Sequence, residues 1–423
     1  MASASTVALT GNNTIDALLS GMRWDTTALT YGFPVAGSDW TGYAAGSEPF
    51  DRFQALTAAQ QSAVTAALST WASVANITFT QVAEPGQVAD LRYAGTGQTN
   101  TAHTYYPHSS PLGGDSWYGP RLTGAATWQP GSYEFETAVH ETGHALGLKH
   151  PHDDSIGGAV AGDNESVERS VMSYRSYAGA PLSDTYTVAP GSYPAGPMLD
   201  DIAAIQYLYG ANYTTNAGDT VYRFTPDQGV IFNTIWDGGG SDTYDLSAYS
   251  SGVSVNLTPG QWSTFASNQL AQLKLDDPSV RAAGNVANAF LFNGDPRSLI
   301  ENAIGGSGND MLTGNDANNM LTGSQGADTL FGNQGADELF GGCGPDILSG
   351  GSGGDIFVEG LGPDTIRDFN FAEGDRIQLG TGSYTVSNGA TGAIVNLDGG
   401  SVTLDGIAAG SVMRDWFILP GNV

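Results

Sequence analysis

The chain has 423 residues, enough for one large or two ordinary domains with cores of their own. It carries 43 acidic and 14 basic residues, a net charge of −29, so nucleic acids and anionic membranes are poor partners and divalent cations are good ones. A single cysteine excludes an intramolecular disulfide, and no apolar run is long enough for membrane insertion. The first residues lack the charged and apolar regions of a secretory signal peptide, which leaves an intracellular location or an export route that needs no such peptide.

Hydrophobic periodicity predicts alternating strands and helices in the first half of the chain. Residues 1–13 are small and polar, and we expect a loose segment there. Thr57 and Gln60 form a capping-box pattern that opens an Ala-rich helix. Residues 107–132, rich in Gly, Pro and Ser, are expected to form a loop. In chain order the predicted elements are a short helix at 14–19, a strand at 29–33, a helix at 57–75, strands at 77–82, 91–94 and 103–106, a helix from about 135, and a helix at 199–209.

Residues 140–150 read HETGHALGLKH, and their spacing predicts a metal site. On a helix, His140 and His144 lie one turn apart, with Cβ atoms roughly 5–6 Å apart. Gly147 can adopt a left-handed conformation that ends the helix and brings in His150 as a third ligand. Glu141 points away from the histidine pair and is placed to touch a water at the metal. Three nitrogen ligands with an open position are typical of a catalytic zinc; the alternative is a helix with three incidental histidines.

A methionine lies in a turn downstream of this motif. Residues 170–174 read SVMSY, and Met172 follows His150 by 22 residues. Such a turn lies beneath the metal in metzincins, whereas ordinary core packing is the alternative for an isolated methionine. The other three histidines, His103, His108 and His152, are expected to be ordinary polar residues. For His103 the alternative is a contact that sets substrate specificity or belongs to an edge strand.

From Gly305 the chain repeats every nine residues in the pattern GGxGxDxUx of calcium-binding β-rolls. The eighth position is apolar in every turn: Leu312, Leu321, Leu330, Leu339, Leu348, Phe357 and Ile366. A flexible Gly-rich linker is the alternative, but a linker does not keep a strict nine-residue register. Because calcium prefers all-oxygen sites, we expect the ion at these turns. The predicted ligands are Asp310, Asp328, Asp337, Asp346, Asp355 and Asp364, with the turn residues Gly306, Gly308, Gly323, Gln325, Gly326, Gly335, Gly341, Cys343, Gly344, Gly350 and Ser352.

Two neighbouring features modify this array. Asn319 and Ala317 occupy positions of the second repeat where Asp and Gly belong, so a site using that repeat should be weak. Before the array, the run WDGGGSDT predicts another calcium loop, for which a plain surface turn is the alternative. The residues expected in that loop are Asp237, Gly239, Gly240, Asp242 and Glu301.

Together, the zinc motif, the methionine turn and the nonapeptide array resemble the serralysins, secreted bacterial zinc metalloproteases of the metzincin clan with RTX repeats. The resemblance runs from about Thr14 to the end of the chain. It implies an α+β zincin-like catalytic domain at 14–212 and an all-β parallel β-roll at 213–423 that carries an export signal. It also implies that Tyr174 is an additional zinc ligand that swings away when substrate binds, and that Glu141 is the catalytic base.

The resemblance further implies a secreted, monomeric endopeptidase that cleaves proteins or peptides, needs zinc and calcium, and leaves the cell through a type I secretion exporter. In the family each calcium ion lies between one turn and the next but one. Four sites are therefore expected, pairing Asp310 with Asp328, Asp328 with Asp346, Asp337 with Asp355, and Asp346 with Asp364. The rival interpretation is a calcium-dependent surface-layer or adhesion protein with a vestigial zinc site.

Three segments depart from the family pattern. Residues 224–235 leave little room for a further calcium loop, and residues 266–296 are longer than usual, with no role suggested by the sequence. Four residues, 420–423, extend beyond the usual acidic and apolar ending.

Overall fold

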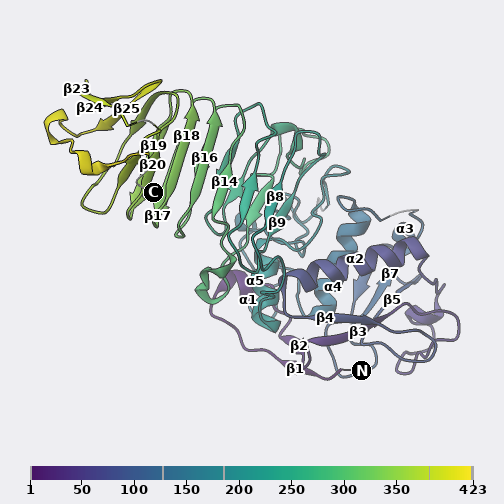
Figure 1. Ribbon diagram of the computed structural model, residues 1–423. Coiled ribbons are helices and arrows are strands. Elements are labelled where there is room, and N and C mark those ends of the chain that lie inside the picture. Colours follow the sequence, from purple (N-terminus) through teal and green to yellow (C-terminus); the bar gives the residue numbers. More distant parts are fainter. Residues whose placement is uncertain (1, 126–127, 184–185, 381, 421–423) are drawn as a thin grey trace. The chain divides into compact units, whose positions relative to one another are not determined.

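The computed structural model describes residues 2–125, 128–183, 186–380 and 382–420, and it divides into two compact units (Figure 1). The first unit comprises Met1–Thr215, Val230–Trp236 and Leu270–Ala283. The second comprises Asn216–Gly229, Asp237–Gln269 and Gly284–Val423. The single domain boundary before residue 213 remains a prediction, since two short segments beyond it group with the first unit.

The first unit is built on a five-stranded sheet in the order β4-β3-β5-β7-β6. All pairs are parallel except β6 with β7, which makes β6 an antiparallel strand at the edge of the sheet. The strands of the whole first unit are β1 (Ala4–Thr6), β2 (Met22–Trp24), β3 (Ala28–Gly32), β4 (Thr78–Gln81), β5 (Leu91–Gly95), β6 (Ala102–Thr104), β7 (Asp115–Tyr118) and β9 (Asn233–Ile235). Its helices are α1 (Asn13–Asp16), α2 (Ala58–Val74), α3 (Pro120–Thr123), α4 (Tyr133–Leu146) and α5 (Leu199–Tyr209).

The long helices begin and end close to where the sequence predicts them. Thr57 and Gln60 form the predicted capping box at the start of α2. Helix α5 ends before Gly210, whose φ of 84° lies in the left-handed region. Helices α2 and α4 pack against each other, and α4 also contacts β6 and β7 (Figure 1). This packing holds the zinc-motif helix beside the sheet edge.

Two of the predictions for the first unit were wrong. The expected loop at 107–132 contains β7 and α3, because Asp115–Tyr118 is buried on both faces and so lacks the alternation by which strands are recognised. The segment expected to be loose contains β1, which pairs antiparallel with β2 through Ala4 and Trp24. Backbone pairing with a distant strand leaves no signal in a short polar segment.

The segment 266–296, which the sequence left without a role, contributes residues 270–283 to the first unit. The backbone N–H of Ala189 donates to the carbonyl oxygen of Gln272 at 2.9 Å. The N–H of Leu275 donates to the carbonyl oxygen of Thr187 at 2.7 Å. Part of this segment therefore braces the loop that follows the methionine turn.

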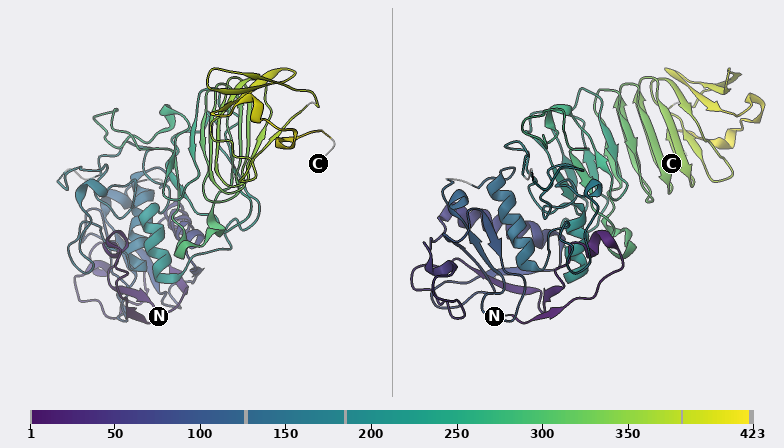
Figure 2. Two further views of the ribbon diagram at one scale, coloured as in Figure 1. Left: turned by 90° about the vertical axis from the view of Figure 1, so that its left-hand side faces the viewer. Right: turned by 180° about the vertical axis from the view of Figure 1, so that it is seen from behind.

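The second unit is a β-roll of two eight-stranded sheets, whose strands pair in parallel except for the antiparallel pairs within residues 385–405. Its successive strands stack in Figure 2. Consecutive turns alternate between the sheets, so paired strands lie 18 residues apart, as in Leu321 with Leu339. Its strands are β8 (Val221–Arg223), β10 (Thr243–Asp245), β11 (Ser254–Asn256), β12 (Trp262–Ser263), β13 (Val286–Asn288), β14 (Asn302–Ile304), β15 (Met311–Thr313), β16 (Met320–Gln325), β17 (Thr329–Gln334), β18 (Glu338–Cys343), β19 (Ile347–Ser352), β20 (Ile356–Val358), β21 (Gly362–Ile366), β22 (Arg376–Gln378), β23 (Thr385–Asn388), β24 (Gly392–Asn396), β25 (Gly400–Asp405) and β26 (Phe417–Ile418).

The core of the roll is the predicted apolar seam. The seven residues at the eighth repeat position, from Leu312 to Ile366, are each exposed by 3% or less. One inward side chain in each turn lets neighbouring turns cover one another. Within the described residues, no helix is long and apolar enough to cross a membrane. Of the expected tail extension at 420–423, residues 421–423 lie outside the described part of the chain.

Candidate metal centre

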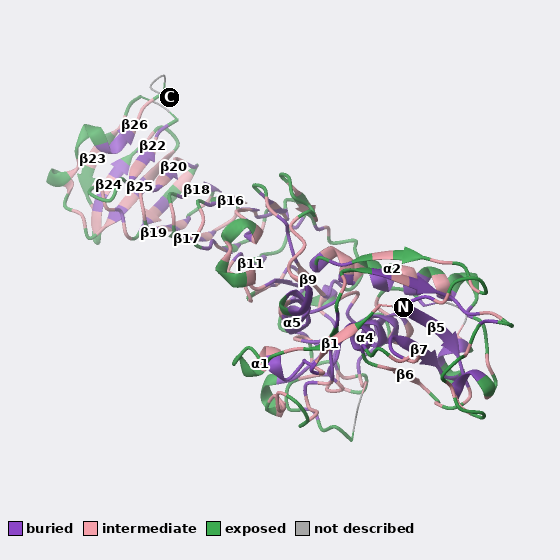
Figure 3. Ribbon diagram, turned by 90° about the horizontal axis from the view of Figure 1, so that it is seen from below, coloured by how far each residue is buried: buried purple, intermediate pink, exposed green. Residues whose placement is uncertain are grey.

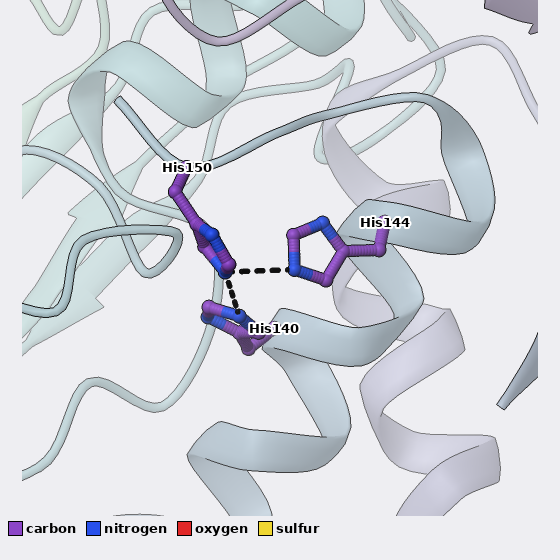
Figure 4. A group of neighbouring side chains, drawn as sticks. All are labelled: His140, His144 and His150. Atoms are coloured by element: carbon purple, nitrogen blue, oxygen red, sulfur yellow. Dashed lines mark hydrogen bonds between the residues drawn. The ribbon is translucent and has the colours of Figure 1, made fainter. Parts of the chain in front are cut away.

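The three predicted histidine ligands converge on one point (Figure 4). The Nε2 atom of His150 lies 3.0 Å from Nε2 of His144 and 3.2 Å from Nε2 of His140. A tetrahedral zinc with Zn–N bonds of about 2.1 Å requires nitrogen separations of about 3.4 Å, close to this arrangement. The imidazole chemistry and the geometry therefore fit a zinc ion.

Local sequence explains how α4 presents these side chains. The Ser132 hydroxyl caps the helix by accepting the N–H of Phe135 at 3.2 Å. Gly147 ends the helix with a φ of 108°, as predicted, and turns the chain toward His150. A side chain at Gly143 would place its Cβ 2.5 Å from Sδ of Met172, which explains the glycine inside the helix. Figure 3 shows that α4 is buried along nearly its whole length.

Hydrogen bonds to carbonyl groups orient two of the rings. Nδ1 of His140 lies 2.8 Å from the carbonyl oxygen of Val171, and Nδ1 of His144 lies 2.8 Å from that of Leu148. Each Nδ1 must donate to its carbonyl, so each Nε2 carries a lone pair directed at the common point. Burial lowers the pKa of His140 to about 3 and that of His144 to about 4. Burial, with the neighbouring imidazoles, also depresses the pKa of His150. The rings are therefore neutral near pH 7, the form that binds a metal.

Glu141 lies beside the histidine cluster and is held from the edge strand. The Thr104 hydroxyl lies 2.7 Å from Oε2 of Glu141. Burial raises the pKa of Glu141 to about 7, while the hydrogen bond from Thr104 opposes that rise. A carboxyl group with a pKa near the working pH can both accept and release a proton.

The predicted methionine turn lies beneath the histidines and is fastened by an aspartate that the sequence did not single out. Met172 is fully buried. Asp201 at the start of α5 accepts a hydrogen bond from the Ser170 hydroxyl at 2.6 Å and one from the N–H of Val171 at 2.7 Å. Burial raises the pKa of Asp201 to about 7. This carboxyl group ties the turn to α5, and only its place in the DDIAAI run hinted at a role.

The ring of Tyr174 lies against the predicted ligands. Its centroid is 4.2 Å from that of His150 and 5.1 Å from that of Tyr186. Burial raises the pKa of Tyr174 to about 12, so its hydroxyl keeps its proton near neutral pH. His152, expected to be an ordinary polar residue, stacks on His150 with an interplanar angle of 3° and bonds through Nδ1 to Glu165 at 2.8 Å. It braces a ligand ring, a role that the sequence did not reveal.

In the roll, the predicted calcium carboxylates form a ladder. One oxygen of Asp328, Asp346, Asp355 and Asp364 accepts the backbone N–H of the aspartate 18 residues earlier, as in Asp310 to Asp328 at 2.7 Å. The corresponding oxygen accepts the N–H of Asn319 at Asp337 and that of Val253 at Asp310. The second oxygen is buried without a hydrogen-bond partner at Asp328, Asp337, Asp346 and Asp355. Burial raises the pKa of Asp328 and Asp337 to about 7. Unpaired buried oxygens of this kind fit a divalent cation.

The second repeat satisfies the same position with amide groups. Asn319 Nδ2 donates to the carbonyl oxygen of Glu301 at 2.9 Å and to Oδ1 of Asn315 at 3.1 Å. Asn315 Nδ2 donates to the carbonyl oxygen of Ile300 at 2.8 Å. Both asparagines are 2% exposed. Their N–H groups therefore bind carbonyl oxygens of this turn that would otherwise be available to a cation.

Further acidic residues join the predicted calcium positions. The N–H of Asp242 donates to Glu301 at 2.7 Å, which brings the two ends of the predicted loop together. Asp219, which the sequence analysis missed, accepts the N–H of Ser241 at 2.9 Å. Asp375 continues the ladder by accepting the N–H of Asp355 at 3.0 Å. It lies 20 residues after Asp355 rather than 18, so the nine-residue repeat does not predict it.

Of the predicted turn ligands, Cys343 and Ser352 already use their carbonyl groups. Their carbonyl oxygens accept N–H groups from Gly326 at 2.9 Å and from Gly335 at 3.0 Å. A carbonyl oxygen has two lone pairs, so this bond leaves one free for an ion. The sulfur of Cys343 is exposed, and it is the reduced thiol of an unpaired cysteine.

Comparisons with known proteins identify the family of the chain. Residues 50–157 match the family model described as Matrixin, and residues 206–388 match the model described as Peptidase M10 serralysin C terminal. Serralysin B of Dickeya chrysanthemi is 38% identical over 283 residues, which are 61% of this chain and 53% of that protein. Metalloprotease AprA of Pseudomonas entomophila (strain L48) is 34% identical over 317 residues, which are 69% of this chain and 59% of that protein. The chain belongs to the serralysin family.

The chain spans a little over half the length of these serralysins, at 53% and 59%. The order of the two matches, Matrixin before the serralysin C-terminal region, confirms the predicted fold class of a zincin-like domain followed by a β-roll. Among the described residues, the histidine cluster and the carboxylate ladder both offer ligands for metal ions.

Proposed function

We propose that this serralysin-family chain is a zinc-dependent endopeptidase. The observation that carries the proposal is the convergence of three neutral imidazoles on one point, with Glu141 next to His140 on α4 and anchored by Thr104. His140, His144 and His150 would hold the zinc ion. A structural zinc site closed by four ligands needs no acid–base residue, so the presence of Glu141 favours catalysis.

Each residue has a separate task in peptide hydrolysis. When bound, zinc lowers the pKa of water from 15.7 to about 7 and polarises a carbonyl group. Glu141 accepts a proton from the attacking water and delivers it to the leaving amine. Tyr174 keeps its proton at neutral pH and, once turned toward the substrate, donates a hydrogen bond to the oxyanion of the tetrahedral state.

The substrate would lie extended along β6, the edge strand next to α4. An edge strand offers unpaired N–H and C=O groups, to which a peptide adds as a further strand. Main-chain recognition of this kind favours broad sequence preference, so proteins and peptides in general are the proposed substrates.

The deciding experiment is casein digestion by the full chain in millimolar calcium. The wild-type protein should cleave casein, 1,10-phenanthroline should stop cleavage by removing zinc, and added zinc should restore it. Keeping calcium in excess separates loss of zinc from loss of the roll. Glu141→Gln should retain zinc and stability while losing about 10²–10⁴-fold in activity, because only the base is removed.

Full activity of zinc-loaded Glu141→Gln would contradict the mechanism. A wild-type protein that binds zinc and calcium yet cleaves nothing would favour the rival function, a surface-layer or adhesion protein.

We further propose that the second unit binds several calcium ions at the aspartate ladder and, at neutral or higher pH, folds only with them. The proposed division of the chain is a protease domain at 14–212 and a roll at 213–423. As a monomeric secreted protein it would leave the cell by a type I exporter that reads the end of the chain. Orphaned carboxylate oxygens in the roll support the calcium proposal.

A further inference from the structure

Thr104 is the last residue of the edge strand β6, and its side chain contacts one hydroxyl group and one carboxyl group. It pairs across the sheet with Ser116 of β7. Its Oγ1 lies 2.7 Å from Oε2 of Glu141 and 2.8 Å from Oγ of Ser116. Ser116 is fully buried, and Glu141 is 5% exposed. The sheet edge is thus joined to the catalytic helix by a chain of three polar side chains.

The Thr104 hydroxyl is the donor toward both of its neighbours, Oε2 of Glu141 and Oγ of Ser116. A hydroxyl group has one proton, so the two acceptors compete for it. An ionised carboxylate can only accept, and its charge makes the bond to Glu141 the stronger of the two.

This bond holds one half of the Glu141 carboxyl group. Oε1 of Glu141 accepts no hydrogen bond from the described residues, so it is the oxygen available to a water molecule. A glutamate side chain rotates about three bonds, and with one oxygen anchored the other can occupy few positions. Because α4 carries Glu141 together with His140 and His144, the anchored carboxyl group also keeps its position relative to these two ligands.

We propose that Thr104 is a positioning residue for Glu141, which fixes Oε2 to the sheet edge so that Oε1 faces the attacking water. This inference rests on the proposed function, in which Glu141 is the base. It also assigns β6 a second task, since the strand that receives the substrate backbone carries the residue that aligns the base.

The test compares Thr104→Val and Thr104→Ser in the calcium-loaded, zinc-loaded full chain. Valine keeps the shape of threonine without the hydroxyl group, and kcat should fall about 10- to 100-fold because the base is misaligned. KM, zinc content and Tm should remain near the wild-type values. Serine retains the hydroxyl group and should restore most of kcat. Thr80→Val, at an exposed threonine of the opposite edge strand β4, is the matched control and should leave kcat unchanged.

Two further measurements separate positioning from other roles. In a Glu141→Gln background, Thr104→Val should cause no further loss, because its effect passes through Glu141. Crystal structures of the wild-type and Thr104→Val proteins should show an ordered Glu141 carboxylate in the first and a displaced or multiply oriented one in the second. Thr104→Ala, which also lacks the hydroxyl group, should lower kcat to a similar extent and serves if the valine variant does not fold.

Several outcomes would overturn the inference. An unchanged kcat in Thr104→Val would show that Glu141 needs no anchor. A raised KM with an unchanged kcat would make Thr104 a substrate contact, and an additive loss in the Glu141→Gln background would place its action elsewhere. Failure of the proposed function would appear differently, as an active Glu141→Gln protein or an inactive wild type.

Discussion

Tyr174 could act either as a zinc ligand or as a hydrogen-bond donor to the oxyanion, and a single substitution distinguishes the two roles. Its ring lies against His150 and Tyr186, within the layer of rings around the metal centre. Replacing it with phenylalanine removes the hydroxyl group and leaves the three imidazoles in place. We expect Tyr174→Phe to lower kcat by about 10²–10³-fold, as loss of an oxyanion donor does, with zinc content unchanged. Metal analysis that showed loss of zinc would make Tyr174 a structural ligand instead.

Glu136 lies one turn before His140 on α4, and both of its carboxyl oxygens are buried without a hydrogen-bond partner. Burial, with the nearby Glu141 and Asp201, raises its pKa well above the ordinary value. The group is therefore a neutral acid in the folded protein, while in the unfolded chain it ionises near pH 4.3. Its contribution to the free energy of unfolding is fully present below that pH and is lost as the pH rises toward the folded pKa.

We predict that Glu136→Gln stabilises the first unit more at pH 8 than at pH 5. The amide has nearly the same shape and no proton to lose, so it removes a cost of up to about 1.4 kcal/mol for each pH unit. Thermal unfolding in excess calcium measures the effect as the Tm difference from wild type. An equal difference at both pH values would mean that Glu136 is ionised or paired in solution.

Among the structural elements, the second repeat stands apart, because Asn315 and Asn319 donate amide protons where the other turns leave carboxylate oxygens free. This turn should hold its shape without an ion. Asn319→Asp removes the amide donor of Asn319 and adds a charge near Glu301. We predict that this variant is less stable than wild type in chelator and regains stability in calcium, with one more calcium ion bound. A metal count after gel filtration, together with unfolding curves, tests this.

The matched control for that prediction is Asn318→Asp, which adds the same charge at an exposed neighbour. Its Oδ1 accepts the N–H of Ala336, a bond that aspartate can keep. Calcium content should not change in this variant. Equal behaviour of the two variants would show that net charge, rather than the buried turn, governs the response to calcium.

At the scale of the whole molecule, calcium ions and protons compete for the same carboxyl groups. Without calcium, burial raises the pKa of Asp328 and Asp337 to about 7 and that of Asp355 and Asp364 to about 6. Groups whose folded pKa is raised stabilise the fold at low pH, and this contribution is lost as the pH rises from about 4 to above 7. The chain carries a net charge of −29, which adds general repulsion at high pH.

We therefore predict that calcium-free protein loses the roll at pH 8 and regains strand structure near pH 5. At pH 8 added calcium should restore the strand structure, whereas at pH 5 it should change the strand signal little, because the protonated roll is already folded there. Circular dichroism of the full chain in chelator and in a calcium titration, at both pH values, measures both effects. Calcium-free strand signal that is stronger at pH 8 than at pH 5 would contradict the linkage.

Features governed by short spacings could be predicted from the sequence. His140 and His144 lie one turn apart on any helix, and Gly147 has the left-handed φ that brings back His150. The nine-residue repeat likewise determines its own contacts, because each turn of a roll packs on its neighbours, and Leu321 and Leu339 are paired and buried as their positions predict. Local periodicity is enough wherever the contacts of a residue lie a fixed number of residues away.

Only the tertiary structure revealed the contacts that orient those groups. Thr104 and Glu141 are 37 residues apart, and Ser170 and Asp201 are 31 apart, with no repeat connecting either pair. The brace formed by residues 270–283 comes from still farther along the chain. These contacts depend on which segments the packing of α4, α5 and the sheet brings together. The sequence does not distinguish a polar residue that faces solvent from one that contacts a catalytic carboxyl group. Only the packing of the folded chain determines which polar residues make such contacts.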